Sequence, residues 1–258
     1  MIYRKFKDLD ISALAFGAMR LPTTGKDSEI DEQKTQELVD RAFEAGINYF
    51  DTAWGYHGGQ SEIVLGKCLA KHPRESFYLA TKFPSYDVSY FTKIEEIFEK
   101  QLEKCGVEYF DFYLLHNVCE LNIEYYLDDC KYGAVSFFLE QVKKGRIKHL
   151  GFSAHGSKET VARLLEKYGK YLEFGMIQLN YLDYDFQNAR GKMELLNRYN
   201  IPVWVMEPLR GGSLAKMDEA NLAKMQALRP GITPVEIAFR FLQSLPNVTT
   251  ILTGMSEM

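Results

Sequence analysis

The sequence has few cysteines, only four among 258 residues. They are Cys68, Cys105, Cys119 and Cys130, and no two of them form a Cys-x-x-Cys pair. The ligand spacing that is typical of a zinc site or an iron–sulfur cluster is therefore missing. Isolated thiols in a chain of this size are most often reduced packing residues. We therefore expect a cytoplasmic protein with no iron–sulfur cluster in this chain.

Long apolar runs and an excess of one charge are also missing. No apolar segment reaches the roughly 18 residues that a membrane-spanning helix needs, and residues 1–8 do not resemble a signal peptide. The 31 Lys and Arg residues nearly balance the 35 Asp and Glu residues, for a net charge of −4. Without a basic block, neither nucleic acid nor an anionic membrane is the expected partner. A small molecule is the remaining candidate.

Strand-like and helix-like patterns alternate along the chain from residue 11 to residue 253. Eight short apolar segments read as buried parallel strands, at residues 13–16, 49–51, 78–81, 110–115, 149–152, 175–179, 203–206 and 249–252. Helical patterns follow the first seven of them, at residues 33–45, 61–70, 90–105, 127–144, 158–167, 191–199 and 234–243. An open doubly wound sheet is the alternative, but no Gly-x-Gly-x-x-Gly motif follows the first strand. We predict an α/β protein with a (β/α)8 TIM barrel.

The two ends of the chain carry separate expectations. Residues 3–6 and 9–12 flank Lys7 and Asp8, a pattern typical of a small β-hairpin that would close the bottom of the barrel. After the eighth strand only a few residues remain, whereas a barrel helix needs about ten or more. We therefore expect residues 1–258 to form a single barrel domain that is truncated at its C-terminal end, with the eighth helix missing.

Four polar residues lie at the carboxyl ends of neighbouring predicted strands or in the loops that follow. They are Asp51, Tyr56, Lys82 and His116. Taken singly, each has an ordinary structural explanation, such as a loop cap, a core tyrosine, a solvated lysine or a hydrogen-bonded histidine. Strand ends of a parallel barrel converge on one face, where the chemistry of such barrels takes place. Together, these residues therefore predict an active site.

The residue types indicate proton transfer to a carbonyl oxygen. A free tyrosine is a weak acid with a pKa near 10, and a neighbouring ammonium favours its phenolate. We expect Lys82 to lower the pKa of Tyr56 in this way, and Asp51 to pair with Lys82 and keep it charged. His116 would donate a hydrogen bond to the carbonyl oxygen and orient it. None of these side chains can supply hydride, so a redox cofactor is needed.

The segments around these residues resemble the aldo-keto reductase family. Residues 46–56 look like its signature, 80–82 match the lysine segment and 114–116 the histidine segment. Residues 151–153, 178–181 and 207–212 resemble later cofactor-binding segments. The resemblance implies a barrel that binds an extended nicotinamide cofactor, usually NADPH, without a Rossmann domain. It also implies hydride transfer between NADPH and a carbonyl substrate, an aldehyde or a ketone, with Tyr56 as the general acid.

The same resemblance implies the residues that would hold NADP(H). Ser153 and Gln178 match residues that bind the nicotinamide carboxamide, while Ala154 stands where many members have asparagine. Met206 occupies the position where many members stack a tyrosine on the nicotinamide ring. The loop around the pyrophosphate would comprise Leu209, Arg210, Gly211 and Gly212, and the segment for the adenosine phosphate would begin with Thr253, Gly254 and Ser256.

Several motifs resemble one branch of the family more closely. These are Gly-Phe-Ser-x-His, Met-Glu-Pro-Leu-Arg-Gly-Gly and Gly-Met-Ser. Members of that branch often carry a C-terminal ferredoxin-like extension with iron–sulfur cysteines, which this chain does not contain. A missing ferredoxin-like domain is accordingly one expected partner.

Two functions other than a reductase are compatible with parts of the sequence. A metal-dependent barrel hydrolase could use Asp51, His116, His155 and Glu207 as ligands, but the Lys82 ammonium would repel a cation, so we expect no metal. A non-catalytic nicotinamide sensor or regulatory subunit would bind the cofactor with negligible turnover. Only kinetics separates such a sensor from a reductase.

Overall fold

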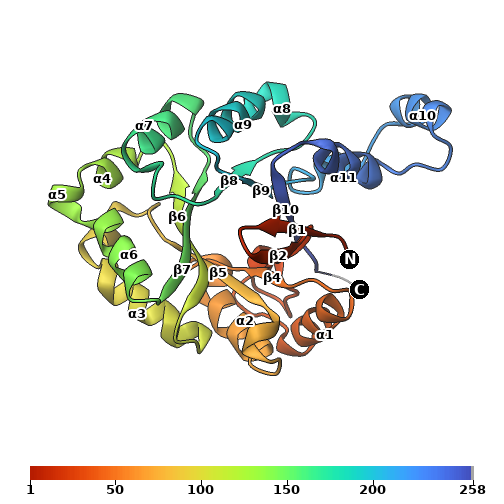
Figure 1. The fold of residues 1–258 in the computed structure, drawn as a ribbon. Coiled ribbons are helices and arrows are strands. Elements are labelled where there is room, and N and C mark those ends of the chain that lie inside the picture. The colour runs from red at the N-terminus through yellow and green to blue at the C-terminus, as the bar shows by residue number, and fades with distance from the viewer. Residues whose placement is uncertain (257–258) are drawn as a thin grey trace.

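Eight parallel strands hydrogen-bond in a closed ring, with helices around the outside (Figure 1). The structure is a computed structural model that describes residues 1–256. Around the ring the order is β10, β3, β4, β5, β6, β7, β8 and β9. Their bounds are β3 Leu14–Gly17, β4 Tyr49–Asp51, β5 Tyr78–Phe83, β6 Phe110–Val118, β7 Ile147–Ala154, β8 Gly175–Gln178, β9 Val203–Met206 and β10 Val248–Gly254. The predicted (β/α)8 barrel is confirmed.

The helices of the outer layer lie between successive strands of the ring. The longer ones are α1 Glu32–Glu44, α2 Ser61–Leu69, α3 Ile94–Cys105, α6 Ala134–Lys143, α7 Lys158–Tyr168, α9 Ala189–Arg198 and α11 Pro234–Ser244. Side chains cap the starts of α1, α7, α9 and α11. At α11, for example, the Thr233 side chain accepts a hydrogen bond from the Glu236 N–H, and Pro234 occupies the first turn. Within residues 1–256, no helix follows β10.

One predicted helix, residues 127–144, is divided into two, α5 Asp129–Tyr132 and α6, and a further short helix, α4 Ile123–Leu127, precedes them. Gly133 adopts a left-handed conformation with φ of 65°, which ends α5. The Asp129 carboxylate then accepts hydrogen bonds from the N–H groups of Val135 and Ser136 at the start of α6. Local capping thus overrides the continuous helical periodicity of this segment.

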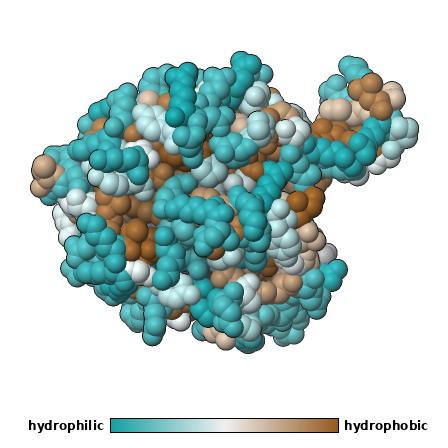
Figure 2. Space-filling view, in the orientation of Figure 1, coloured by the Kyte–Doolittle hydropathy of each residue, from teal (hydrophilic) through white to brown (hydrophobic). Residues whose placement is uncertain are grey.

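The segment between β9 and α11 contains a helix that the sequence analysis did not predict. This helix, α10 (Glu219–Leu228), has no buried residue and stands away from the barrel (Figure 1). In the same orientation the surface is mostly hydrophilic, and apolar side chains gather at the base of the arm that carries α10 (Figure 2). No helix among residues 1–256 is long and apolar enough to cross a membrane.

An antiparallel hairpin of β1 (Tyr3–Phe6) and β2 (Leu9–Ser12) closes the amino end of the barrel, as predicted. Phe6 reaches into the barrel, where its ring centroid lies 5.1 Å from that of Trp204 and 5.6 Å from that of Phe112. Both partners lie near the amino ends of their strands. An aromatic core therefore fills this end of the barrel, and the opposite, carboxyl end remains open for a site.

Candidate active site

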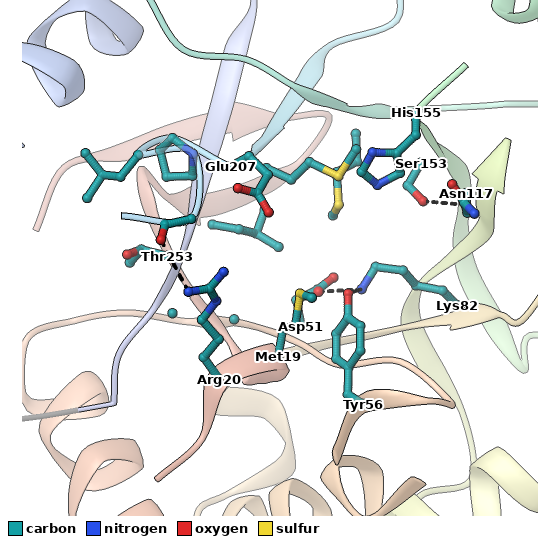
Figure 3. A pocket seen from close by; sticks show the side chains of 18 of the residues that line it. Met19, Arg20, Asp51, Tyr56, Lys82, Asn117, Ser153, His155, Glu207 and Thr253 are labelled. Carbon is teal, nitrogen blue, oxygen red and sulfur yellow. Dashed lines mark hydrogen bonds and ion pairs between the residues drawn. The ribbon is translucent and has the colours of Figure 1, made fainter. Parts of the chain in front are cut away.

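A cavity of about 610 Å³ opens at the carboxyl ends of the strands (Figure 3). It is large enough for a cofactor-sized ligand. Most of the residues that the sequence predicted for the site line it, namely Asp51, Tyr56, Lys82, His116, Ser153, Met206, Leu209, Gly211, Gly212, Thr253, Gly254 and Ser256. Two predicted residues, Gln178 and Arg210, do not.

The Lys82 ammonium lies at the centre of a buried polar group. Its Nζ donates to Asp51 Oδ1 at 2.5 Å and to the Thr52 carbonyl oxygen at 2.7 Å, and it lies 3.5 Å from the Tyr56 hydroxyl. Strand register explains the contact. Asp51 pairs with Ala80 across β4 and β5, and Lys82 lies two residues further along on the same face as Ala80. The predicted ion pair is therefore present, with Tyr56 beside it (Figure 3).

Burial changes the pKa values of Asp51, Tyr56 and Lys82. Burial alone would lower the pKa of Lys82, but Asp51 and Tyr56 outweigh it, so its pKa is raised and the ammonium persists. Burial raises the pKa of Tyr56, and the nearby ammonium only partly offsets this. The expectation that Lys82 would bring the pKa of Tyr56 below its usual value was therefore wrong. Exclusion of water destabilises the phenolate form of Tyr56, and the ammonium 3.5 Å away stabilises that form by a smaller amount.

His116 faces Tyr56 edge-on, with ring centroids 6.3 Å apart and planes at 83°. Burial, together with the charge of Lys82, holds the pKa of His116 well below its usual range, so the imidazole is neutral. Its Nδ1 is buried and has no hydrogen-bond partner within residues 1–256. The backbone is fixed because its carbonyl oxygen accepts hydrogen bonds from the Ser85 and Tyr126 hydroxyls. A neutral imidazole can donate one hydrogen bond without adding charge to the cavity.

The loop that carries Tyr56 is held by its neighbour His57, which the sequence analysis did not single out. His57 is buried and adopts a left-handed conformation with φ of 52°. Its Nε2 accepts a hydrogen bond from the Leu21 N–H at 2.9 Å, and its Nδ1 lies 2.7 Å from the Asp27 carbonyl oxygen. The ring thereby ties the Tyr56 loop to the loop that follows β3.

The residues expected to hold a carboxamide lie at the ends of adjacent strands. Ser153 Oγ accepts a hydrogen bond from the Asn117 N–H at 2.9 Å, which leaves its own proton free to be donated. Met206 projects into the cavity, whereas Ala154 is fully buried and offers no polar side chain. Gln178 lies opposite Met206 across β8 and β9, and its Nε2 donates to Asp183 Oδ2 at 2.9 Å.

The loop after β9 has the backbone of an anion-binding turn. Glu207, Arg210, Gly211 and Gly212 all have positive φ angles, and the two glycines line the cavity. The Arg210 side chain, however, does not line it. Its Nε lies 3.5 Å from Asp183 Oδ1, and its guanidinium packs over the ring of Phe186. The expected place of this side chain at the pyrophosphate is thus corrected, because a fully buried carboxylate attracts it elsewhere.

Other residues of the cavity were missed or were given another role. Met19 and Arg20 follow β3, and Arg20 Nη1 lies 3.5 Å from the Gly211 carbonyl oxygen. Their place directly after a strand was a usable signal. Glu207 and His155 also line the cavity. The sequence suggested both as metal ligands, and it also placed Glu207 in a segment that resembles a cofactor-binding one. Among residues 1–256, no group of three or more His, Cys, Asp or Glu side chains could hold a metal ion.

Residues 13–258 match the model of the aldo/keto reductase family. A Bacillus subtilis relative named uncharacterized oxidoreductase YqkF is 26% identical, over 97% of this chain and 85% of its own length. The 6-dehydroglucose reductase of Novosphingobium aromaticivorans is 30% identical, over 96% and 83%. The holo form of aldo-keto reductase AKR11C1 from Bacillus halodurans superposes with a TM-score of 0.78 at 25% identity, covering 100% of this chain and 87% of that one.

Proposed function

Because this chain belongs to the aldo/keto reductase family, we propose that it transfers hydride between NADPH and a small aldehyde or ketone, with Tyr56 as the general acid. The observation that carries the proposal is the buried contact of Lys82 with both Asp51 and the Tyr56 hydroxyl at the floor of the cavity. An ion pair that only stabilised the fold would not need a tyrosine hydroxyl beside it, and this hydroxyl borders the open cavity.

The cavity fits a nicotinamide cofactor in two respects. Gly211 and Gly212 have φ angles of 65° and 91° and contribute to its lining, so their backbone can approach a phosphate closely. Ser153 offers a hydroxyl proton, and Met206 offers a polarisable thioether, which packs well on an aromatic ring. Bound NADPH would supply the hydride. Ser153, Met206, Gly211, Gly212 and Arg20 would hold it.

The protein's own residues then manage the proton. With a raised pKa, Tyr56 retains its proton at neutral pH and can give it to a carbonyl oxygen that gains negative charge. The Lys82 ammonium stabilises the phenolate that is left, and Asp51 holds that ammonium in place. Neutral His116 donates a hydrogen bond to the same oxygen, and this orients the substrate.

The substrate class is proposed from the chemistry of the site and from the relatives. Tyr86 lies beside His116 with ring centroids 6.0 Å apart and borders the cavity, so an apolar or aromatic group can pack there. The name of the Novosphingobium relative points to an oxidised sugar. Small aldehydes and ketones of both kinds therefore belong in the first substrate panel.

Tyr56→Phe tests the proposal. The variant should bind NADPH like the unaltered protein but lose at least about a hundredfold in turnover, the usual scale for a general acid. Reduction of the panel is followed by the loss of NADPH absorbance, and binding by fluorescence titration. Tyr90→Phe, outside the cavity lining, serves as the matched control. A Tyr56→Phe enzyme that works at the normal rate would remove Tyr56 from the mechanism, and tight binding without any turnover would indicate a sensor.

A further inference from the structure

A buried cluster of polar side chains lies on the helix side of β5, between α2 and α3. At its centre is Glu62, in the first turn of α2, whose side chain is fully buried. Glu62 Oε1 accepts hydrogen bonds from the Thr81 hydroxyl and from Gln101 Nε2, both at 2.7 Å. Glu62 Oε2 pairs with the Lys104 ammonium at 2.6 Å. None of these four residues lines the cavity, so any effect of the cluster on the site must pass through other residues.

The cluster reaches Lys82 through the backbone of β5. Gln101 Nε2 also donates to the Lys82 carbonyl oxygen at 3.0 Å. The orientation of this amide is fixed at its other end, because Gln101 Oε1 accepts a hydrogen bond from the Tyr113 hydroxyl at 2.6 Å. Burial raises the pKa of Tyr113 well above its usual value, so this hydroxyl remains a donor. Side chains alternate along a strand, so Thr81 faces the helices while Lys82 faces the cavity.

The same cluster reaches the loop that carries Tyr56. The Lys104 ammonium lies 4.4 Å from the centroid of the Trp54 ring, a cation–π contact, and Trp54 precedes Tyr56 by two residues. Glu62 holds that ammonium in place, and the Lys104 side chain is only 9% exposed. The Glu62 carboxylate is therefore linked to the Tyr56 loop on one side and to the Lys82 backbone on the other.

Of the three hydrogen-bonding contacts of the Lys82 ammonium, the one with Tyr56 is the most sensitive to displacement. Lys82 Nζ lies 2.5 Å from Asp51 Oδ1 and 2.7 Å from the Thr52 carbonyl oxygen, but 3.5 Å from the Tyr56 hydroxyl. The longest distance is at the limit of a hydrogen bond, so a shift of about half an ångström would break that contact and leave the other two. The contact therefore depends on how firmly the end of β5 and the Tyr56 loop are held.

We propose that Glu62 is a positioning residue that keeps the Lys82 ammonium within reach of the Tyr56 phenol. The inference rests on the proposed function, in which that phenol is the proton donor. Glu62→Gln is the informative change because it preserves the shape of the side chain. Whichever way the new amide turns, its NH2 group faces a donor, either the Lys104 ammonium or the Gln101 amide. In the first case the link through Lys104 is lost, and in the second case the link through Gln101 is lost.

Two measurements separate positioning from a contribution to stability alone, and the first is kinetic. Glu62→Gln should lower kcat and kcat/KM equally, by about ten- to a hundredfold, the scale of a small misplacement of reacting groups. Its NADPH affinity in a fluorescence titration should stay within about twofold, because the cluster lies outside the cavity. Leu164→Ala, which removes buried volume on α7 away from the cluster, should lower the urea midpoint without changing kcat.

The second measurement needs no cofactor. The ζ-carbon NMR signal of Tyr56, assigned by its absence in Tyr56→Phe, senses the neighbouring ammonium at neutral pH, where the phenol keeps its proton. This signal should move in Glu62→Gln but not in Glu103→Gln, which alters an exposed carboxylate on α3. Gln101→Met retains the charge of Glu62, so the same movement in that variant would come from the lost link to Lys82 and not from a missing charge.

The outcomes are distinguishable. If the unaltered protein neither binds NADPH nor reduces the substrate panel, the proposed function fails, and the Tyr56 signal still tests the role of Glu62. If Glu62→Gln does not fold, Gln101→Met carries both measurements, since it retains the ion pair of Glu62 with Lys104. Unchanged kcat in a folded variant, or a fall in kcat with the Tyr56 signal in its original place, would overturn the inference.

Discussion

Lys82→Met is expected to destabilise the fold far more than an ordinary surface substitution would. The side chains of Lys82 and Asp51 are only 1% and 3% exposed, and their charged atoms lie 2.5 Å apart. Methionine fills nearly the same volume, so the change mainly removes the ammonium. The Asp51 carboxylate is then left in the barrel without its counter-charge, and the Thr52 carbonyl loses its donor.

The magnitude follows from the geometry. Two unit charges 2.5 Å apart attract by about 7 kcal/mol at an effective dielectric constant near 20. Most of that gross energy offsets the removal of both charges from water. Removing only one partner leaves the other desolvated, which costs about 3–5 kcal/mol. The double variant Asp51→Asn/Lys82→Met removes both charges and should recover most of this loss.

The loss should also depend on pH. In the unaltered protein the raised pKa of Lys82 contributes stability throughout the neutral range, and this stability is lost only as the pH rises through that value. Burial already raises the pKa of Asp51, and without Lys82 the rise is greater. A carboxyl group whose pKa is higher in the folded than in the unfolded state stabilises the fold at a pH below its unfolded-state pKa. This stability is lost as the pH rises through the folded-state pKa. The deficit of Lys82→Met should therefore shrink as the pH falls from the neutral range through the raised pKa of Asp51.

Urea unfolding followed by circular dichroism measures these differences. Lys67→Met is the matched control, since its ion pair with Glu32 is more than half exposed on both sides and should contribute less than about 1 kcal/mol. Lys82→Met should also lower turnover by at least about a hundredfold, because the charge that favours the phenolate is gone. A deficit below about 1 kcal/mol that does not change with pH would refute the reasoning.

Two further changes test other parts of the structure. Arg20→Leu should weaken NADPH binding about ten- to a hundredfold in a fluorescence titration, the scale of one charge-assisted hydrogen bond, because this guanidinium lies beside the Gly211 backbone in the cavity. Arg190→Leu is its surface control, and affinity within about twofold in both variants would exclude Arg20 from the anion site. Gly66→Ala should cost about 1–3 kcal/mol in urea unfolding, since a Cβ there would lie 2.4 Å from the Cys105 carbonyl oxygen between α2 and α3. Lys67→Ala on the same helix should be nearly neutral, and equal stability of the two variants would contradict the close approach.

The barrel and much of its cavity could be predicted because both follow from periodic patterns. Alternating strand and helix segments specify a parallel sheet with helices outside, and the carboxyl ends of its strands must converge. Asp51, Lys82 and His116 could therefore be placed near one another from their positions along the chain. The same rule would have identified Met19 and Arg20 after β3.

Other features depend on contacts between side chains from distant segments, which no periodicity contains. The break between α5 and α6 depends on Gly133 and on capping by Asp129, and the direction of Arg210 depends on the buried Asp183. The sequence indicated that an arginine was present in the loop, but it did not indicate which carboxylate would bind it.

The acidity of the site shows most clearly the difference between what the sequence determines and what the tertiary structure decides. The sequence by itself determined that a phenol, an ammonium, a carboxylate and an imidazole would meet at the open end of a barrel. Only the tertiary structure decided that burial outweighs the ammonium at Tyr56, and that Gln178 turns its NH2 group toward Asp183. Residue identity sets which charges and donors exist, whereas distance and exclusion of water set the sign of their effects.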